Sequence, residues 1–283
     1  MALTCPVCAA ADVRHKLRKQ GVDVLQCAAC GLAFWLPGES FDPARIYDGD
    51  YFASDTAAHG YDDYAALEPA LRATFRRRLA RLRLPAGARM LDAGAAYGYA
   101  ASEAEHAGLR VAAVELSGEA AAHAAALLPG RVARASADRL PFSAASFDAI
   151  MLWDVLEHLP DPHRAIAELA RCLRPGGRLA LTTGDVGSVA ARLCGARWHL
   201  YTLPEHLFFH SRESLRRLLG AHGLRIERMR AEGGLYPVGY LVERLRKTLL
   251  GAASAGPLRF PGARLVLPVN LFDVLSVVAV RAQ

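Results

Sequence analysis

The sequence predicts an α/β protein with a parallel sheet, and three observations lead to this prediction. Short apolar strands alternate with helices between residues 85 and 183, and turns rich in Pro and Gly mark the joins. This alternation is typical of a parallel sheet with helices on both faces. Four cysteines in two close pairs precede that region and predict a small separate module. The 283 residues suffice for one large domain and such a module.

The expected elements follow one another along the chain. Residues 1–35 should form two loops joined by a hairpin, and residues 36–84 a connector that ends in an amphipathic helix over 67–84. The main domain, 85–283, should then contain strands over 89–91, 110–114, 132–135, 149–152, 178–183, 224–230 and 274–280. Its expected helices are 100–107, 118–128, 163–173, 211–222 and 239–250. Two segments interrupt this pattern and are predicted as insertions: 184–211 and 232–270.

Composition and charge indicate an ordinary globular protein. The chain is 53% hydrophobic and 22% charged. It has neither an apolar stretch of roughly 18 residues nor the features of a secretion signal, so we expect a cytoplasmic protein without a membrane span. The net charge is +6, but Lys and Arg are scattered. Their densest group has the spacing of a solvent-exposed helix face, so nucleic acid is not an expected partner; it comprises Arg76, Arg77, Arg78, Arg81 and Arg83.

Two Cys-x-x-Cys pairs indicate a metal site. Cys5 and Cys8 form the first pair, and Cys27 and Cys30 form the second, with 18 residues between the pairs. This spacing predicts a structural zinc, because four thiolates fill a tetrahedral coordination sphere. Metal binding would supply much of the folding free energy of so small a module. The alternatives are free thiols or disulfides, and a cytoplasmic compartment disfavours disulfides. Two further cysteines are expected to be packing residues: Cys172 and Cys194.

A glycine-containing turn joins the first parallel strand to the next helix. Gly94 allows the backbone to turn tightly, and Gly98 permits close approach of the helix to a ligand or a strand. The amides at the start of the helix, together with Asp92, are expected to face a ligand above the strand. Glu115 ends the next strand, where a carboxylate can accept hydrogen bonds from ribose hydroxyls. These residues suit a nicotinamide dinucleotide as well as an adenosyl sulfonium.

Four motifs, taken in order, make the sequence resemble class I S-adenosylmethionine-dependent methyltransferases. They are Leu91-Asp92-Ala93-Gly94; Leu140-Pro141-Phe142 with Ser146-Phe147-Asp148; Trp153-Asp154-Val155-Leu156-Glu157-His158-Leu159; and Leu173-Arg174-Pro175-Gly176-Gly177. The resemblance is close over residues 88–183 and looser to residue 283. It implies a Rossmann-like, mostly parallel sheet of seven strands whose last strand is antiparallel. Zinc-knuckle members have a tyrosine-rich connector, matched here by Tyr47, Tyr51 and residues 60–64.

The resemblance also implies which residues hold the methyl donor, S-adenosylmethionine. They are, around its methionine part, Asp92, Gly94, Ala95 and Gly98; at the ribose and adenine, Glu115, Leu116, Ala137 and Asp138; near the sulfonium, Trp153 and Asp154; and above the cofactor, Tyr61. Two positions depart from the family pattern. Ala96 replaces a usual glycine, and Ser136 replaces an acidic residue near the adenine amine.

The insertions 184–211 and 232–270 are expected to form the site of the methyl acceptor. The first follows the fifth strand and mixes aromatic with titratable side chains, which suits a pocket. Its His206 is a candidate general base, and His158 is a second candidate because it follows the fourth strand. The competing interpretation is structural, with His206 capping the next helix and His158 hydrogen bonded within its own helix.

The expected function is methyl transfer to a small molecule. A hydroxyl of a sugar, of a phenol or quinone, or of a secondary metabolite is the expected acceptor group. One alternative is an NAD-dependent oxidoreductase, which the incomplete glycine pattern and the four motifs disfavour. The other is a zinc-knuckle protein that binds RNA or another protein and has a degenerate cofactor site.

Overall fold

The structure is a computed structural model that describes residues 3–38, 41–42, 52, 64–250 and 260–283. Three residues of the tyrosine-rich connector lie outside these ranges: Tyr47, Tyr51 and Tyr61, the last of which is the residue expected above the cofactor. Among the helices within these ranges, none combines the length and the apolar character that crossing a membrane requires.

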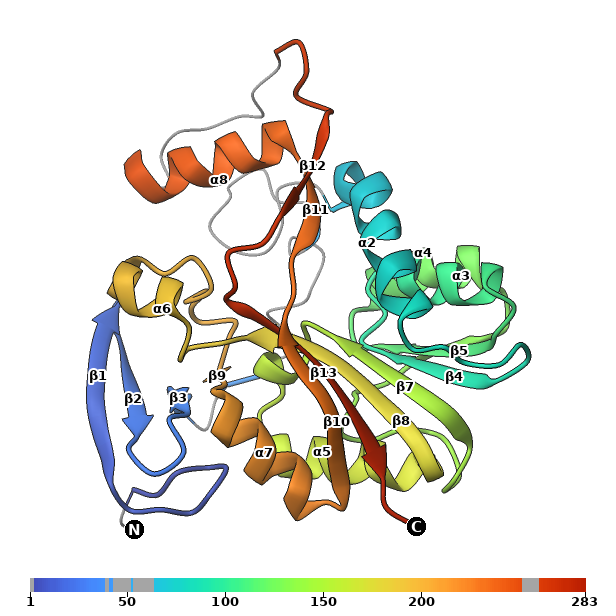
Figure 1. The fold of residues 1–283 in the computed structure, drawn as a ribbon, viewed down its shortest axis with the longest axis horizontal. Coiled ribbons are helices and arrows are strands. Elements are labelled where there is room, and N and C mark those ends of the chain that lie inside the picture. The colour runs from blue at the N-terminus through green and yellow to red at the C-terminus, as the bar shows by residue number, and fades with distance from the viewer. Residues whose placement is uncertain (1–2, 39–40, 43–51, 53–63, 251–259) are drawn as a thin grey trace.

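A seven-stranded sheet forms the centre of the molecule (Figure 1), with the strand order β10-β13-β8-β7-β4-β5-β6. The strands are β4 (Arg89–Ala93), β5 (Arg110–Glu115), β6 (Val132–Arg134), β7 (Phe147–Trp153), β8 (Leu173–Gly184), β10 (Leu224–Ala231) and β13 (Val274–Arg281). The last strand, β13, lies between β8 and β10 and is antiparallel to both, whereas the pairs from β8 to β6 are parallel. The predicted fold class is therefore confirmed, including the antiparallel last strand.

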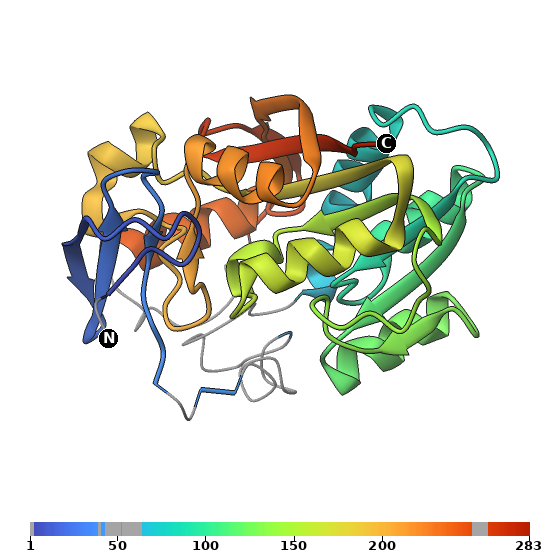
Figure 2. The same cartoon turned by 90° about the horizontal axis from the view of Figure 1, so that it is seen from below.

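Helices cover both faces of this sheet (Figures 1 and 2). The helices are α2 (Glu68–Ala80), α3 (Tyr99–His106) and α4 (Gly118–Leu127) on one face, and α5 (Pro162–Cys172) and α7 (Arg212–Ala221) on the other. Alternate residues of β7 belong to two different cores: Met151 and Trp153 pack towards α2 and α3, and Ile150 and Leu152 towards α5 and α7. This division follows from the period of two in a β-strand.

Most element boundaries agree with the expectation to within one or two residues, and two differ by more. The helix predicted to reach residue 84 ends at Ala80, because Arg83 adopts a positive φ of 49° and Leu84 precedes a proline, which disfavours helix. Strand β8 begins before the expected residue 178. Its first residue, Leu173, pairs with Phe147, and regular pairing resumes at Arg178, so the expected turn forms a bulge within β8.

The N-terminal module and the first insertion share one small sheet. It has the order β1-β2-β3-β9 and consists of β1 (Val13–Lys19), β2 (Val22–Cys27), β3 (Ala33–Phe34) and β9 (Phe208–Phe209). The same insertion contains α6 (Val189–Cys194) and the 3-10 turn η4 (Gly195–Arg197). Strand β9 extends the cysteine module's hairpin across the edge of the main domain, close to η3 (Leu156–His158), the turn that follows β7.

The second insertion forms a separate projection. Strands β11 (Gly234–Pro237) and β12 (Val266–Val269) pair antiparallel, and α8 (Val238–Leu250) lies beside them at the top of Figure 1. Helix α2 packs beside this projection against β11, where the hydroxyl of Thr74 accepts a hydrogen bond from the amide of Leu235 at 3.0 Å. The short 3-10 turn η2 (Ala65–Leu67) leads into α2.

Candidate functional site

Three neighbouring strands, β4, β5 and β7, bring the predicted cofactor residues to one edge of the sheet. Each strand ends with its carboxyl end at this edge, since all three are parallel. The turn after β4 needs two glycines with positive φ, 85° at Gly94 and 81° at Gly98. A Cβ on Gly94 would lie 2.5 Å from Val155 Cγ2, and one on Gly98 would lie 3.0 Å from Ala124 of α4. Gly98 thus allows two helices to approach each other, rather than a helix and a strand.

The amides of this turn are used within the protein. Those of Gly94 and Ala95 donate to the carbonyl of Val114, and that of Gly98 donates to the carbonyl of Ala95. The amide of Ala96 donates to the carboxylate of Glu115. These four amides therefore already have protein acceptors. The helix itself begins at Tyr99, and the expectation that its first amides face a ligand stays a prediction. Ala96 itself has a φ of 47°, a conformation that glycine adopts more easily.

Two buried carboxylates lie at the ends of β4 and β5. Asp92 is 1% exposed, and its Oδ2 has no hydrogen-bond partner among the described residues. Burial raises the pKa of Asp92 well above its usual value, and the negative charge of Glu115 raises it further. Burial also raises the pKa of Glu115, although the amides of Ser117 and Ala96 oppose the shift by donating to its carboxylate at 2.9 and 2.7 Å.

The end of β7 is covered by an arginine that the sequence did not single out. Arg78 was expected on a solvent-exposed face, but it is 8% exposed and its guanidinium lies 5.2 Å from the ring centre of Trp153. It also lies 3.6 Å from the carboxylate of Asp154 and 3.3 Å from the hydroxyl of Thr182. The expectation was wrong here because α2 packs against the sheet along this side. The indole Nε1 of Trp153 is buried and has no partner among the residues described.

The remaining cofactor candidates follow β5 and β6. Leu116 is half-buried directly after Glu115, and Ala137 is buried in the core on the α5 side. Asp138 lies 3.6 Å from Arg164 of α5, so its carboxylate already has a cationic neighbour. The roles of these three residues towards a cofactor stay predictions.

The two candidate bases lie against each other. The rings of His158 and His206 are perpendicular, with centres 4.6 Å apart. His158 Nδ1 is 3.2 Å from the carbonyl of Glu205, and His206 Nδ1 is 2.9 Å from the carbonyl of Leu200. Both structural alternatives are wrong in detail, since the His158 bond reaches a distant segment and Ser211, not His206, caps α7. The carbonyls fix Nδ1 as the protonated nitrogen and leave the lone pair on Nε2.

Burial keeps both imidazoles neutral. It lowers the pKa of His158 to about 4, with partial compensation from the Glu205 carbonyl, and lowers the pKa of His206 well below its usual value. The neighbouring Glu157 is 4% exposed, and burial raises its pKa to about 8, with a further contribution from the charge of Asp154. Glu157 is not among the residues predicted from the sequence, although its place one turn after Asp154 and beside His158 is a usable signal.

The four N-terminal cysteines converge on one point. Their Sγ atoms all lie within 4.8 Å of one another, and the pairs Cys5–Cys30 and Cys8–Cys27 are each 3.6 Å apart. A tetrahedral zinc site with bonds of about 2.3 Å has sulfur–sulfur edges of about 3.8 Å. Cys5, Cys27 and Cys30 also belong to the core that contains α5 and α7. The cluster is thus continuous with the main domain's packing.

Comparison with known proteins gives the family. Residues 57–228, more than half of the chain, match the family described as a methyltransferase domain. The chain belongs to the methyltransferase family. An uncharacterized methyltransferase from Mycobacterium sp. strain KMS is 36% identical over 145 residues, 51% of this chain and 52% of its own. A ubiquinone biosynthesis O-methyltransferase from Xanthomonas axonopodis pv. citri is 36% identical over 130 residues, 43% of this chain and 54% of its own.

The alignments with these curated methyltransferases span about half of each relative's length. A solved structure from Bacillus halodurans, of a protein assigned as a methyltransferase, superposes with a TM-score of 0.56 at 15% identity. It covers 75% of this chain and 100% of its own, and supports the fold alone.

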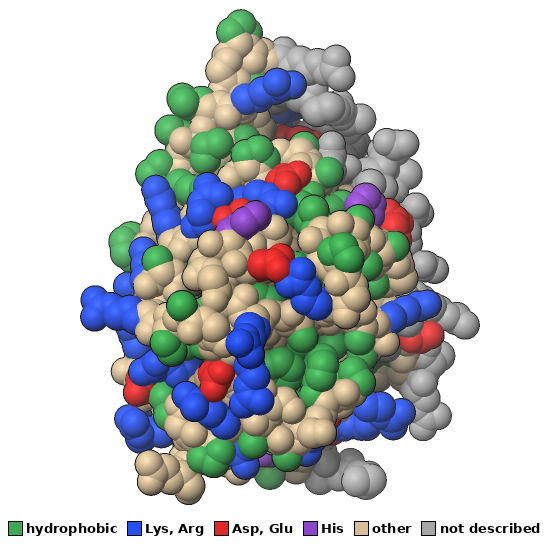
Figure 3. All heavy atoms as spheres, turned by 90° about the vertical axis from the view of Figure 1, so that its right-hand side faces the viewer, with side chains coloured by type: hydrophobic (Ala, Val, Ile, Leu, Met, Phe, Trp, Pro, Cys, Tyr) green, Lys and Arg blue, Asp and Glu red, His purple; other side chains and the backbone are tan. Residues whose placement is uncertain are grey.

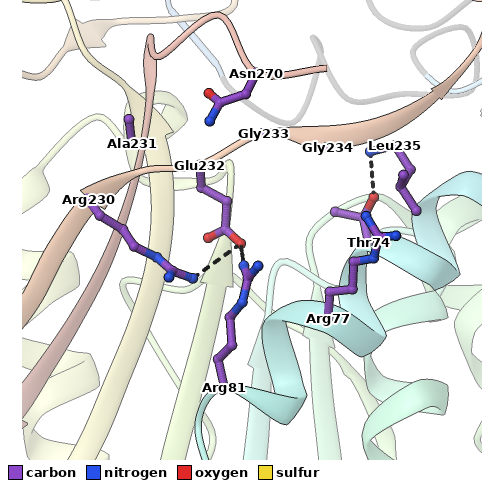
Figure 4. A pocket seen from close by; sticks show the side chains of 10 residues that line it. All are labelled: Thr74, Arg77, Arg81, Arg230, Ala231, Glu232, Gly233, Gly234, Leu235 and Asn270. Atoms are coloured by element: carbon purple, nitrogen blue, oxygen red, sulfur yellow. Dashed lines mark hydrogen bonds and ion pairs between the residues drawn. The ribbon is translucent and has the colours of Figure 1, made fainter. Parts of the chain in front are cut away.

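A cavity of about 150 Å³ lies apart from the predicted site of this methyltransferase-family protein, between α2 and the second insertion (Figure 4). Among its charged lining groups, Glu232 pairs with Arg81 and lies 3.9 Å from Arg230, and Arg77 lines the cavity as well. None of the residues predicted from the sequence to bind a cofactor or act as a base lines it. The second insertion, 232–270, contributes part of the lining, so its expected role at the acceptor site stays a prediction.

The surface of the methyltransferase-family domain was expected to carry scattered basic residues. On the face seen in Figure 3, Lys and Arg side chains are spread among apolar and acidic ones rather than gathered in one stripe. Several members of the densest arginine group have carboxylate partners: Arg76 pairs with Glu103, Arg78 with Asp154 and Arg81 with Glu232.

Proposed function

We propose that this protein transfers a methyl group from S-adenosylmethionine to a hydroxyl oxygen of a small molecule. The observation that carries the proposal is the pair of buried carboxylates, Asp92 and Glu115, at adjacent carboxyl ends of a methyltransferase-family sheet. In open α/β sheets ligands bind at this edge. The buried, unpartnered Oδ2 of Asp92 fits a ligand that brings a cationic or hydrogen-bond donor group to the turn.

The residues at this edge suit the different parts of the methyl donor. Asp92 with Gly94, Ala95 and Gly98 would face its methionine part, and Glu115 its ribose. Leu116, Ala137 and Asp138 would border the adenine, and Trp153 and Asp154 would lie near the sulfonium, with Tyr61 above. When bound, S-adenosylmethionine supplies the methyl group on a cationic sulfur. The protein's own contribution is to orient the acceptor in line with that bond and to exclude water.

We infer that an imidazole accepts the proton of the acceptor. His206 and His158 carry neutral rings with their lone pairs on Nε2, and they follow β7 or face the turn after it. In the proposed reaction the acceptor oxygen bonds to the methyl carbon as the carbon–sulfur bond breaks. The hydroxyl proton passes to Nε2, and S-adenosylhomocysteine leaves with the bonding electron pair. An oxygen acceptor is supported by the Xanthomonas relative, whose name describes an O-methyltransferase.

We also propose that Cys5, Cys8, Cys27 and Cys30 bind a structural zinc ion. The distances among their Sγ atoms suit a tetrahedral ion, and four protein ligands leave no position for a substrate. Because three of these cysteines belong to the main core, the metal would hold the module on the α5 and α7 face.

Calorimetry tests the cofactor assignment directly. S-adenosylhomocysteine should bind with micromolar affinity and NADH should not; the reverse result would remove the proposal in favour of an oxidoreductase. A screen of sugars, phenols and other hydroxyl compounds with labelled methyl donor would then identify the acceptor. Once turnover is measurable, the His206→Ala variant should lose most of it, and unchanged turnover would exclude His206 as the base.

A further inference from the structure

A second cluster of metal-binding groups lies at the end of β7, away from the cysteines. Ligand atoms of Glu157, His158 and His206 all lie within 4.8 Å of one another. We propose that these three side chains bind a divalent transition-metal ion. Two neutral imidazoles and one carboxylate suit Mn²⁺, Fe²⁺ or Zn²⁺ better than the hard ions Mg²⁺ and Ca²⁺, which favour oxygen ligands.

The carboxylate is the first reason for this assignment. Glu157 is 4% exposed, and its Oε2 has no hydrogen-bond partner among the residues that the structure describes. A buried, unsatisfied carboxylate oxygen is costly and requires an explanation. Among the described residues, the groups that influence this carboxylate are the two imidazoles, the hydroxyl of Thr183 and the negative charge of Asp154, with no Lys or Arg among them. A metal ion is the partner that would satisfy the carboxylate and both imidazoles together.

The orientation of the two imidazoles is the second reason. Each Nδ1 faces a backbone carbonyl, that of Glu205 for His158 and that of Leu200 for His206. Metal-binding histidines typically donate their other ring N–H to a carbonyl or a carboxylate, which fixes the ring and its tautomer. Nε2 is then the nitrogen able to bind a cation on both rings.

The segments that carry the three groups are joined before any metal binds. The carbonyl of Glu157 accepts a hydrogen bond from the amide of Leu207 at 2.8 Å. The indole of Trp35, from the N-terminal module, donates to the carbonyl of His206 at 2.8 Å. Hydrogen bonds at the carbonyl of His206 and the amide of Leu207 thus hold this segment in place beside η3. Rigid support of this kind is what a metal site needs.

Three protein ligands leave at least one position for a substrate oxygen. A metal ion lowers the pKa of a bound hydroxyl and orients it. Because Nε2 of both rings would then be a metal ligand, neither imidazole could also accept a proton. The metal-bound hydroxyl would release its proton to water, and the metal would take the place of the imidazole base in the proposed function. This consequence rests on the proposed methyl transfer to oxygen, whereas the metal site itself does not. It favours acceptors whose hydroxyl can bind a metal ion directly.

Binding of Mn²⁺ to the full-length, zinc-loaded protein tests the inference. Free Mn²⁺ gives a sharp six-line electron paramagnetic resonance signal that is lost on binding, and thiolate sites such as the cysteine cluster disfavour this ion. We expect one Mn²⁺ per chain in the unmodified protein. The Glu157→Gln and His206→Asn variants should each weaken binding at least tenfold, while His222→Ala should not, since His222 belongs to a histidine pair with His163 elsewhere.

Calorimetry with S-adenosylhomocysteine on the same proteins reports whether each variant is folded and separates the two proposals. A variant that still binds S-adenosylhomocysteine but not Mn²⁺ supports the metal site. Unmodified protein that binds S-adenosylhomocysteine but no Mn²⁺ overturns the metal site and leaves the proposed function standing. Mn²⁺ binding that is equal in the unmodified protein and both variants also overturns it. Specific Mn²⁺ binding without cofactor binding would leave the metal site standing and remove the proposed function.

Discussion

The amide of Ala96 donates a hydrogen bond to Glu115 Oε2 at 2.7 Å, which joins the turn after β4 to the end of β5. The other carboxylate oxygen accepts from the amide of Ser117 at 2.9 Å. One side chain therefore stabilises both loops at which the cofactor is expected. Each carboxylate oxygen can still accept a further bond, since it has two lone pairs.

Replacing Glu115 by Gln should weaken cofactor binding. The glutamine side chain has only one acceptor oxygen, so it cannot accept hydrogen bonds from both Ala96 and Ser117 as the carboxylate does. Hydrogen bonds to a charged group contribute about 1.5–3 kcal/mol each. We expect the affinity for S-adenosylhomocysteine to fall by about tenfold or more, measured by calorimetry. Glu119→Gln, an exposed substitution in the first turn of α4, is the matched control. Equal affinities of the two variants would contradict a role for Glu115 in binding.

Gly94→Ala should destabilise the protein through two separable effects. Its positive φ costs an L residue about 1–2 kcal/mol, and its Cβ would lie 2.5 Å from Val155 Cγ2. The control is Gly130→Ala, where φ is 73° and nothing lies within 4 Å of the added Cβ. We expect Gly94→Ala to lower the free energy of unfolding in urea by about 1–3 kcal/mol more than Gly130→Ala does.

A double-mutant cycle isolates the contact with Val155. Val155→Ala removes the two methyl groups that a Cβ at position 94 would meet, so part of the loss should be recovered when both changes are combined. Additive effects of the two substitutions would show that backbone conformation alone, rather than the close approach, requires glycine at position 94.

His210 should make the protein less stable in acid. It is fully buried, its Nε2 has no partner among the described residues, and burial lowers its pKa to about 3. Below pH 6.5 the unfolded chain binds a proton at this residue and the folded chain does not. The contribution of His210 to the free energy of unfolding is therefore fully present above about pH 6.5 and is lost as the pH falls towards 3.

The loss from this residue should reach about 1.4 kcal/mol at pH 5.5. Unfolding free energies at pH 7.5 and 5.5 should therefore differ by about that amount more in the unmodified protein than in His210→Gln. The glutamine is uncharged at both pH values, so the comparison cancels the contributions of the other histidines. An unchanged pH dependence in the variant would mean that His210 is accessible to protons in the folded state.

Cys27→Ser should remove the proposed zinc and loosen the N-terminal module. Cys27 is buried and its Sγ lies 3.6 Å from that of Cys8. We expect metal analysis to show one zinc ion fewer per chain and thermal unfolding to begin at a lower temperature. Cys194→Ser, at an exposed cysteine outside the cluster, should change neither. Equal zinc content in the two variants would argue that the four thiols remain free.

Local sequence patterns were sufficient for much of the fold. The alternation of apolar strands and helices predicted the strands of the parallel sheet, because each element needs one buried face whose period is visible in a short window. The Cys-x-x-Cys spacing likewise predicted a convergence of the first four cysteines, which the Sγ distances confirm. The antiparallel orientation of β13 was predicted only from the resemblance to a family. A short stretch of sequence does not show the direction in which a strand pairs with its neighbours.

Contacts between distant segments could not be predicted from local sequence patterns. Arg78 stands in a run of arginines typical of an exposed helix face, yet α2 packs so that this one side chain covers Trp153. Strand β9 pairs with β3 although it belongs to the first insertion. A two-residue strand is too short to show an alternating pattern of apolar residues. Such a strand can be recognised only from its hydrogen bonds to a neighbouring strand in the folded protein.

The sequence by itself determined the family, the order of the main elements and the residues at the ends of the strands. It could do so because glycine turns, strand ends and cysteine pairs are local features. Only the tertiary structure decided that the amides of the glycine turn are already bonded, and that His206 lies against Glu157 and His158. Those relationships depend on how segments far apart in the chain pack together, and hydrogen bonds and buried charges are satisfied at that level.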